Sequence, residues 1–307
     1  MNRGIWYAVG AYGLWGLFPI YWKWLHHVSA PQLLSHRILW SFFLLFVIVV
    51  LSHEWRSFRN AIPHARVLLV YSGAAILVGV NWLLYVWAVN AGFVVETSLG
   101  YFINPLLSVL MGVIFLREHL RPWQWVPVAL AAVGMLYLTF SYGSPPWIAL
   151  TLAFTWATYG LIKKTAPLGP LNGLTLETGL LLLPSLVYLG YAETIGKGAF
   201  MHSGMLSDML LLGTGLITAA PLLLFASAVR RIPLSLVGIL QYIAPIIQFL
   251  LGVLVYKEPF TVNQLIGFGL VWVALIVFGV EGFLAHRARA LIRARAAQEM
   301  EPEPVEF

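Results

Sequence analysis

Cysteine is absent from this sequence of 307 residues, and charged residues make up only 10% of it. The absence of cysteine excludes disulfides, thiolate metal sites and cysteine nucleophiles. The shortage of charge excludes an ordinary soluble globular protein, in which about a quarter of the residues are charged.

Motifs for catalysis or ATP hydrolysis are also missing. His53-Glu54 is not followed by a second histidine at zinc-peptidase spacing, and neither G-x-S-x-G nor the phosphate-binding G-x-x-x-x-G-K-[ST] occurs. An intramembrane enzyme would need a convergent acid/base or metal set, which the chain does not offer. We therefore expect no enzyme activity, no metal and no cofactor, and ATP cannot drive transport through this chain alone.

Apolar residues, in contrast, make up 60% of the chain. Windows of about 20 apolar residues can cross a bilayer as helices, and counting them predicts an all-α polytopic membrane protein with ten transmembrane helices. The predicted spans are 5–22, 32–51, 67–89, 94–115, 123–140, 146–162, 172–190, 208–229, 233–256 and 262–284. The longest loops are 52–66 and 191–207, and residues 285–307 form a tail that is first basic and then acidic.

The apolar sequence repeats itself. Residues 81–136 align with 221–276 at a constant offset of 140, which superposes Pro105 on Pro245 and Gln124 on Gln264. The first two spans of each half align at an offset of 141, with Trp15 on Trp156. These landmarks predict two five-helix repeats, 1–140 and 141–284, followed by the tail 285–307.

Lysine and arginine placement predicts the orientation, because cytoplasmic loops of membrane proteins are enriched in both. With both termini cytoplasmic, fourteen of these residues lie inside, and only Lys23, Lys197 and Lys257 lie outside. Five is an odd number, so the second repeat enters the membrane inverted. Inverted repeats in secondary transporters place the binding site between the halves near the midplane. The same bias accounts for the net charge of +6 without a nucleic-acid partner.

Ionisable residues within spans are costly and are candidates for function. Arg37 and Glu96 both enter from the outer side, and we predict that they pair near the outer mouth of a cavity. Lys164 and Glu177 form the corresponding predicted pair near the inner mouth. The alternative is that both pairs only fix helix packing. His36 and Lys23 are added as candidate substrate-binding residues, although a hydrogen-bonded interior histidine is an equally good interpretation of His36.

A second set of candidates combines amides with tyrosines. Asn and Gln in hydrocarbon need a partner, which is either a neighbouring helix or a ligand. The predicted substrate-binding members of this set are Asn81, Tyr85, Tyr101, Asn104, Gln241 and Tyr242. Pro105 and Pro245, at equivalent positions, are expected to bend their helices and shape the cavity.

Five longer strings resemble one family. They are WGLFPIYWK (15–23), SHRILWS (35–41), NWLLYVWAV (81–89), SLGYFINPL (98–106) and GILQYIAP (238–245). They are similar to the RarD branch of the EamA family, in the drug/metabolite transporter superfamily. The resemblance covers all ten spans and implies a permease of two inverted five-helix repeats. The branch usually has Glu where this chain has Gln32. This position therefore lacks a carboxylate, which argues against proton coupling through it.

These observations favour a secondary transporter of the bacterial inner membrane that moves a small polar or amphipathic metabolite or drug by alternating access. Export is the more usual direction in the superfamily, and a proton is the candidate coupling ion. Spans 5 and 10 carry few polar residues and could support a homodimer within the lipid bilayer. The alternative is a receptor or scaffold on the same fold that transports nothing. A transporter should contain a polar midplane cavity, whereas a scaffold should be packed solid.

Overall fold

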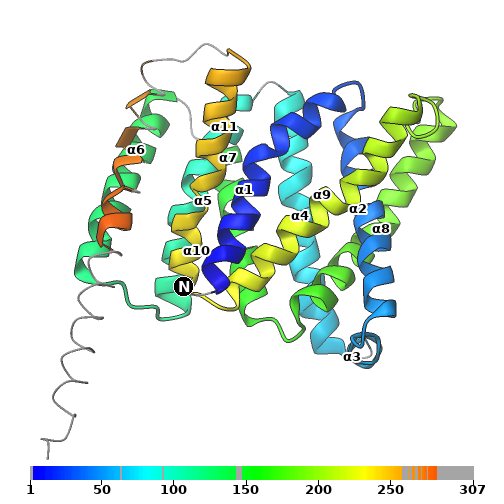
Figure 1. Cartoon of the computed structure of the whole chain (residues 1–307), viewed down its shortest axis with the longest axis horizontal. Helices are drawn as coiled ribbons and strands as arrows, with labels where there is room; N and C mark the ends of the chain where they lie inside the picture. The colour runs from blue at the N-terminus through cyan, green and yellow to red at the C-terminus, as the bar shows by residue number, and fades with distance from the viewer. Residues whose placement is uncertain are drawn as a thin grey trace, which may run out of the picture. The chain divides into compact units, whose positions relative to one another are not determined.

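A computed structural model describes residues 3–62, 64–91, 93–142 and 147–257, together with residues 262, 265–266, 269–270, 272–274 and 276–281. The regular structure within these residues is helical (Figure 1). The chain divides into two compact units, one from Met1–Glu118 and Pro145–Pro259 and the other from His119–Ser144 and Phe260–Phe307.

The first unit holds most of the helices. They are α1 (Arg3–Trp24), α2 (Ala30–Leu51), α3 (Trp55–Ala61), α4 (Ala65–Asn90), α5 (Val94–Phe115), α7 (Trp147–Thr165), α8 (Pro170–Thr194), α9 (Met205–Val229), α10 (Leu234–Leu240), α11 (Ile243–Leu250) and the π-helical turn η2 (Leu251–Val255). In the second unit, the short 3₁₀ helix η1 (Pro122–Gln124) leads into α6 (Trp125–Tyr142), and Arg121 forms an ion pair with Glu281 at 3.0 Å.

Helix positions agree closely with the hydropathy windows. Five of the described segments are long and apolar enough to cross a membrane: Ala30–Leu51, Ala65–Ala88, Pro170–Thr194, Met205–Val229 and Leu234–Val255. Helices α1, α5, α6 and α7 match four further predicted spans in position. Within the tenth predicted span, 262–284, the described residues are helical, whereas the tail lies outside the described residues. The loop predicted at 52–66 contains the short helix α3.

The ninth predicted span, 233–256, is not one continuous α-helix. It breaks after Leu240, and α11 begins at Ile243 (Figure 1). Proline lacks an N–H group, so Pro245 cannot donate to the carbonyl of Gln241 four residues earlier. That carbonyl accepts from the Ala244 amide at 3.3 Å instead, and Gln241 keeps right-handed helical dihedral angles. Pro105, at the equivalent position, lies inside the uninterrupted helix α5. The two prolines therefore have different effects on their helices.

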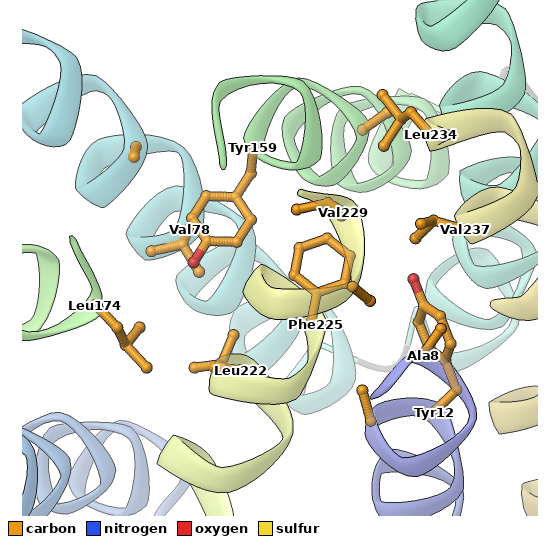
Figure 2. Close-up of a cluster of buried hydrophobic side chains, with 14 of the residues drawn as sticks. Ala8, Tyr12, Val78, Tyr159, Leu174, Leu222, Phe225, Val229, Leu234 and Val237 are labelled. Atoms are coloured by element: carbon orange, nitrogen blue, oxygen red, sulfur yellow. The ribbon is translucent and has the colours of Figure 1, made fainter. Parts of the chain in front are cut away.

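The core of the first unit gathers around Phe225 of α9. Its ring lies 6.1 Å from the ring of Tyr159 on α7 and 6.3 Å from that of Tyr12 on α1, measured between centroids (Figure 2). Alanine and glycine allow the surrounding helices to approach closely, as in other membrane proteins. A Cβ atom on Gly215 of α9 would lie 2.6 Å from the carbonyl carbon of Trp40 on α2. The α2–α9 contact thus depends on the missing side chain.

Candidate substrate cavity

The first unit contains a cavity of about 180 Å³. Its walls come from α1, α2, α4, α5, α7 and the break between α10 and α11. Helix α1 contributes one face, because its lining residues follow helical spacing: Tyr12, Trp15, Phe18, Pro19 and Trp22. The volume is below the roughly 300–1,000 Å³ of pockets for drug-sized ligands, so a fitting ligand is small.

Six of the nine predicted substrate-binding residues line this cavity. They are Arg37, Asn81, Tyr85, Tyr101, Asn104 and Gln241. Gln248, which the sequence analysis did not single out, lines it as well and donates a hydrogen bond to the carbonyl of Trp15 at 3.0 Å. The structure therefore brings together polar side chains that lie far apart in the sequence.

Arg37 supplies the positive charge of the cavity. Its Nε donates to Thr218 Oγ1 at 3.0 Å. The guanidinium carbon lies 5.0 Å from the ring of Trp22 and 4.8 Å from that of Trp82, measured to the centroids. Indole faces attract cations through their quadrupoles, so these two rings hold the guanidinium plane in place.

Asn81 and the tyrosine pair form the wall near α7. Asn81 Nδ2 donates to the carbonyl of Leu152 at 2.8 Å and to Thr155 Oγ1 at 2.9 Å, which fixes the amide. The rings of Tyr85 and Tyr101 pack edge to face, 5.9 Å apart. Asn81 and both tyrosines also line a smaller neighbouring cavity of about 20 Å³.

Asn104 and Gln241 come from different halves of the sequence, and both line the cavity. Their side chains are 5% and 6% exposed, and neither Asn104 Oδ1 nor Gln241 Oε1 has a hydrogen-bond partner within the described part of the chain. An unsatisfied buried acceptor costs about 1–3 kcal/mol. Such groups in a cavity wall are explained by a ligand or by water.

Lys23, His36 and Tyr242 are not among the lining residues. The Nζ atom of Lys23 lies over the ring of Tyr256, 3.4 Å from its centroid. His36 is buried with its ring 5.6 Å from that of Phe200, and the Tyr242 hydroxyl donates to the carbonyl of Phe102 at 3.2 Å. These three residues were grouped with the cavity because of their neighbours in sequence, but helical geometry turns them towards other contacts.

The predicted pairing of Lys164 with Glu177 is wrong. Lys163 is the partner, with its Nζ 2.8 Å from Glu177 Oε1, and Tyr159 donates to Glu177 Oε2 at 2.9 Å. Tyr159 and Lys163 are four residues apart, so they share one face of α7. Lys164 lies about 100° further round the helix.

Lys164 instead contacts the end of α9 and the turn that leads to α10. Its Nζ donates to the carbonyls of Val229 and Ile232 and lies 3.7 Å from Glu118 Oε1. The Glu118 carboxylate accepts hydrogen bonds from the Leu234 and Ser235 amides at 2.6 and 2.9 Å, and from Ser235 Oγ at 2.7 Å. Glu118 thereby joins the chain just after α5 to the first turn of α10.

Glu96, the predicted partner of Arg37, has a side chain that lies outside the described residues, so that pair stays a prediction. The sequence analysis missed Trp22, Thr218 and Gln248. Gln248 carried a usable signal, because an amide in an apolar span needs a partner. Thr218 carried none, since threonine is common in membrane helices.

The cavity and its helical walls define a polytopic membrane protein with an internal polar site. The sequence model of the EamA-like transporter family matches residues 2–140 and 145–280, and the chain belongs to this family. It is 45% identical to Protein RarD of Streptomyces exfoliatus over 96% of this chain and 94% of that protein. It is 38% identical to Protein RarD of Escherichia coli over 93% and 97% of the two chains.

Two further similarities extend this picture. An uncharacterized transporter of Bacillus subtilis, YojE, is 42% identical over 90% of this chain and 93% of its own. A solved structure described only as the crystal structure of a protein superposes with a TM-score of 0.65, at 16% identity, over 89% of this chain and 96% of that one. At that identity the likeness concerns the fold alone.

Proposed function

We propose that this protein is a secondary transporter that carries a small polar or amphipathic molecule across the bacterial inner membrane by alternating access. The observation that supports this most directly is the cavity, which places an arginine and several amides inside a helix bundle. A scaffold has no need of unsatisfied amide oxygens in its interior, so the cavity favours a ligand-binding protein over a scaffold. The named transporters among the relatives support the same conclusion and favour it over an enzyme.

The helix contacts support an arrangement as two inverted repeats. Under the sequence repeat, α1, α2 and α4 correspond to α7, α8 and α9, and α5 corresponds to α10 with α11. Helix α1 packs on α9 and α11, and its counterpart α7 packs on α4 and α5. Helix α2 packs on α9, as α8 packs on α4. The equivalent residues Trp15 and Trp156 contact each other, with centroids 5.3 Å apart.

Two of the lining residues, Trp15 and Trp156, belong to an aromatic cluster. The Phe225 centroid lies 5.8 Å from that of Trp15 and 5.3 Å from that of Trp156. Glu118 separately holds the start of α10. In alternating access, contacts of these two kinds would form and break as a mouth of the cavity closes and opens.

Substrate flux tests the proposal. In vesicles containing the purified protein, a panel of labelled metabolites should include at least one whose exchange requires the protein. Gln241→Ala should lower that exchange at least several-fold, because it removes a cavity amide at the helix break. Tyr242→Phe is the matched control, since the neighbouring Tyr242 contacts Phe102 instead. Equal exchange by both variants and the native chain would place Gln241 outside the transport path.

Labelling tests the orientation. We expect a cysteine at Lys197 to react with an impermeant thiol reagent from outside intact cells. A cysteine at Arg59 or Arg231 should react only after the cells are opened. The native chain has no cysteine, so each variant carries one reactive site. The opposite pattern would contradict the cytoplasmic placement of both termini.

A further inference from the structure

Arg37 is oriented by its neighbours without being neutralised by them. Its contacts are the hydroxyl of Thr218 and the faces of Trp22 and Trp82. No carboxylate lies within ion-pair distance of Arg37 among the side chains that the structure describes. A hydroxyl group and two indole rings fix the guanidinium plane but carry no net negative charge.

This arrangement leaves most of the guanidinium available. Arginine has five N–H donors, and the bond to Thr218 uses only the one on Nε. The remaining donors form the planar end of the side chain, whose geometry matches both oxygens of a carboxylate. An arginine within a membrane span is costly. Cation–π contacts offset only part of that cost, so an anion in the cavity would stabilise the site further.

The second feature of the cavity is its free acceptors. Asn104 Oδ1 and Gln241 Oε1 are buried without a partner in the described structure, although both residues line the cavity. Rotation of either amide would present its oxygen to a ligand, from which it could accept a hydrogen bond. Both acceptors are uncharged, as is Asn81 in the same wall. A ligand ammonium group placed among them would keep its charge uncompensated, which is costly away from water. A hydroxyl group satisfies the same oxygens at no such cost.

We propose that the cavity binds a small hydroxycarboxylate, with the carboxylate on Arg37 and the hydroxyl on the oxygens of Asn104 and Gln241. The inference deepens the proposed function, on which it rests, by naming the substrate class of the same site. The volume of about 180 Å³ limits the ligand to a small molecule. The tryptophans of α1 and α4 suit an apolar or aromatic group on its remaining side.

Ligand-dependent thermal unfolding of the purified full-length protein in detergent tests the charge requirement. The probes are two acids and their isosteric amides, mandelate with mandelamide and lactate with lactamide. At least one acid should raise the melting temperature more than its amide. The affinity of Arg37→Gln for that acid should be lower than that of the native chain by about tenfold or more, because a charge-assisted bidentate contact is lost. Arg37→Lys should retain part of the preference for the acid over its amide. Lys23→Gln, which removes a cation outside the cavity, should leave it unchanged.

The hydroxyl requirement is tested with two analogues of mandelate. Phenylacetate lacks the hydroxyl group, and phenylglycine replaces it with an ammonium group. We expect both to bind more weakly than mandelate to the native chain, and we expect Gln241→Ala to reduce the advantage of mandelate over phenylacetate. Stronger binding of phenylglycine would overturn the assignment of a hydroxyl. If neither acid stabilises the protein more than its amide, the carboxylate site is overturned.

Glu96 provides the competing explanation for Arg37. If Arg37 serves mainly as its ion-pair partner, Arg37→Gln combined with Glu96→Gln should be as stable as the native chain, and no probe acid should show a preference over its amide. That result would refute the proposal. Acid binding without flux in vesicles would instead contradict the transport function and leave the carboxylate site standing. Flux without any preference for acids would contradict the carboxylate site and leave the transport function standing.

Discussion

Replacing Lys163 should reveal how strongly the buried ion pair holds α7 to α8. The side chains of Lys163 and Glu177 are 3% and 1% exposed, with 2.8 Å between Nζ and Oε1. Lys163→Met leaves the Glu177 carboxylate buried, with the Tyr159 hydroxyl as its one remaining donor among the described residues. Stranding one member of a buried pair costs about 3–5 kcal/mol. We therefore expect a loss of several degrees in the melting temperature of the detergent-purified protein.

The double variant separates charge from packing. Lys163→Met with Glu177→Leu replaces both charges by apolar groups of similar size, a change that is often neutral or stabilising by about 1–4 kcal/mol. It should therefore melt well above the single variant. Lys23→Met is the control for lysine removal, since Lys23 is exposed and its ammonium group lies over the face of Tyr256. If the double variant melts no higher than Lys163→Met, or if Lys163→Met is as mild as Lys23→Met, the two charges are not coupled.

Two further substitutions probe contacts between helices. Glu118→Ala removes three hydrogen bonds to the start of α10 and should lower the unfolding free energy by about 2–3 kcal/mol. Glu193→Ala, at an exposed pair with His202, should cost under about 1 kcal/mol, and equal melting of the two variants would contradict the reasoning. Gly215→Ala pushes a methyl group against the backbone of Trp40 and should cost about 1–3 kcal/mol. Gly13→Ala, with open space around it, should be neutral or slightly stabilising, and a similar loss in both would show that close packing at Gly215 is unimportant.

The sequence predicted helix positions well because an apolar span is a property of composition. It predicted the break at Gln241 less well, because two prolines at equivalent positions act differently: Pro105 stays within α5, whereas Pro245 follows an interruption. Whether a helix tolerates a proline depends on what re-satisfies the freed backbone groups, and neighbouring helices decide this.

The candidate site, like the fold, was predicted correctly in part, and the remainder depended on how the helices pack. Polar residues in spans were good predictors of the cavity, and Arg37, Asn81 and Gln241 all line it. The partner of Glu177 was misassigned by one position, which on a helix is a rotation of about 100°. Distinguishing Lys163 from Lys164 requires knowing which face of α7 meets α8, and no residue in α7 alone specifies that face.

Tyr85 and Phe225 occupy equivalent positions of the sequence repeat, yet their surroundings in the structure differ. Tyr85 lines the cavity, whereas Phe225 fills the core beside Tyr159 (Figure 2). Duplication supplied two copies of one wall, and only one has kept its hydroxyl and its neighbouring amide. If the cavity opens to the other side of the membrane, the pocket wall related by pseudo-two-fold symmetry would present phenylalanine and leucine where the present one offers tyrosine and tryptophan. A ligand would therefore be held with different affinity from the two sides of the membrane, so half-saturating concentrations measured in the two directions should differ even when the protein works as a passive exchanger.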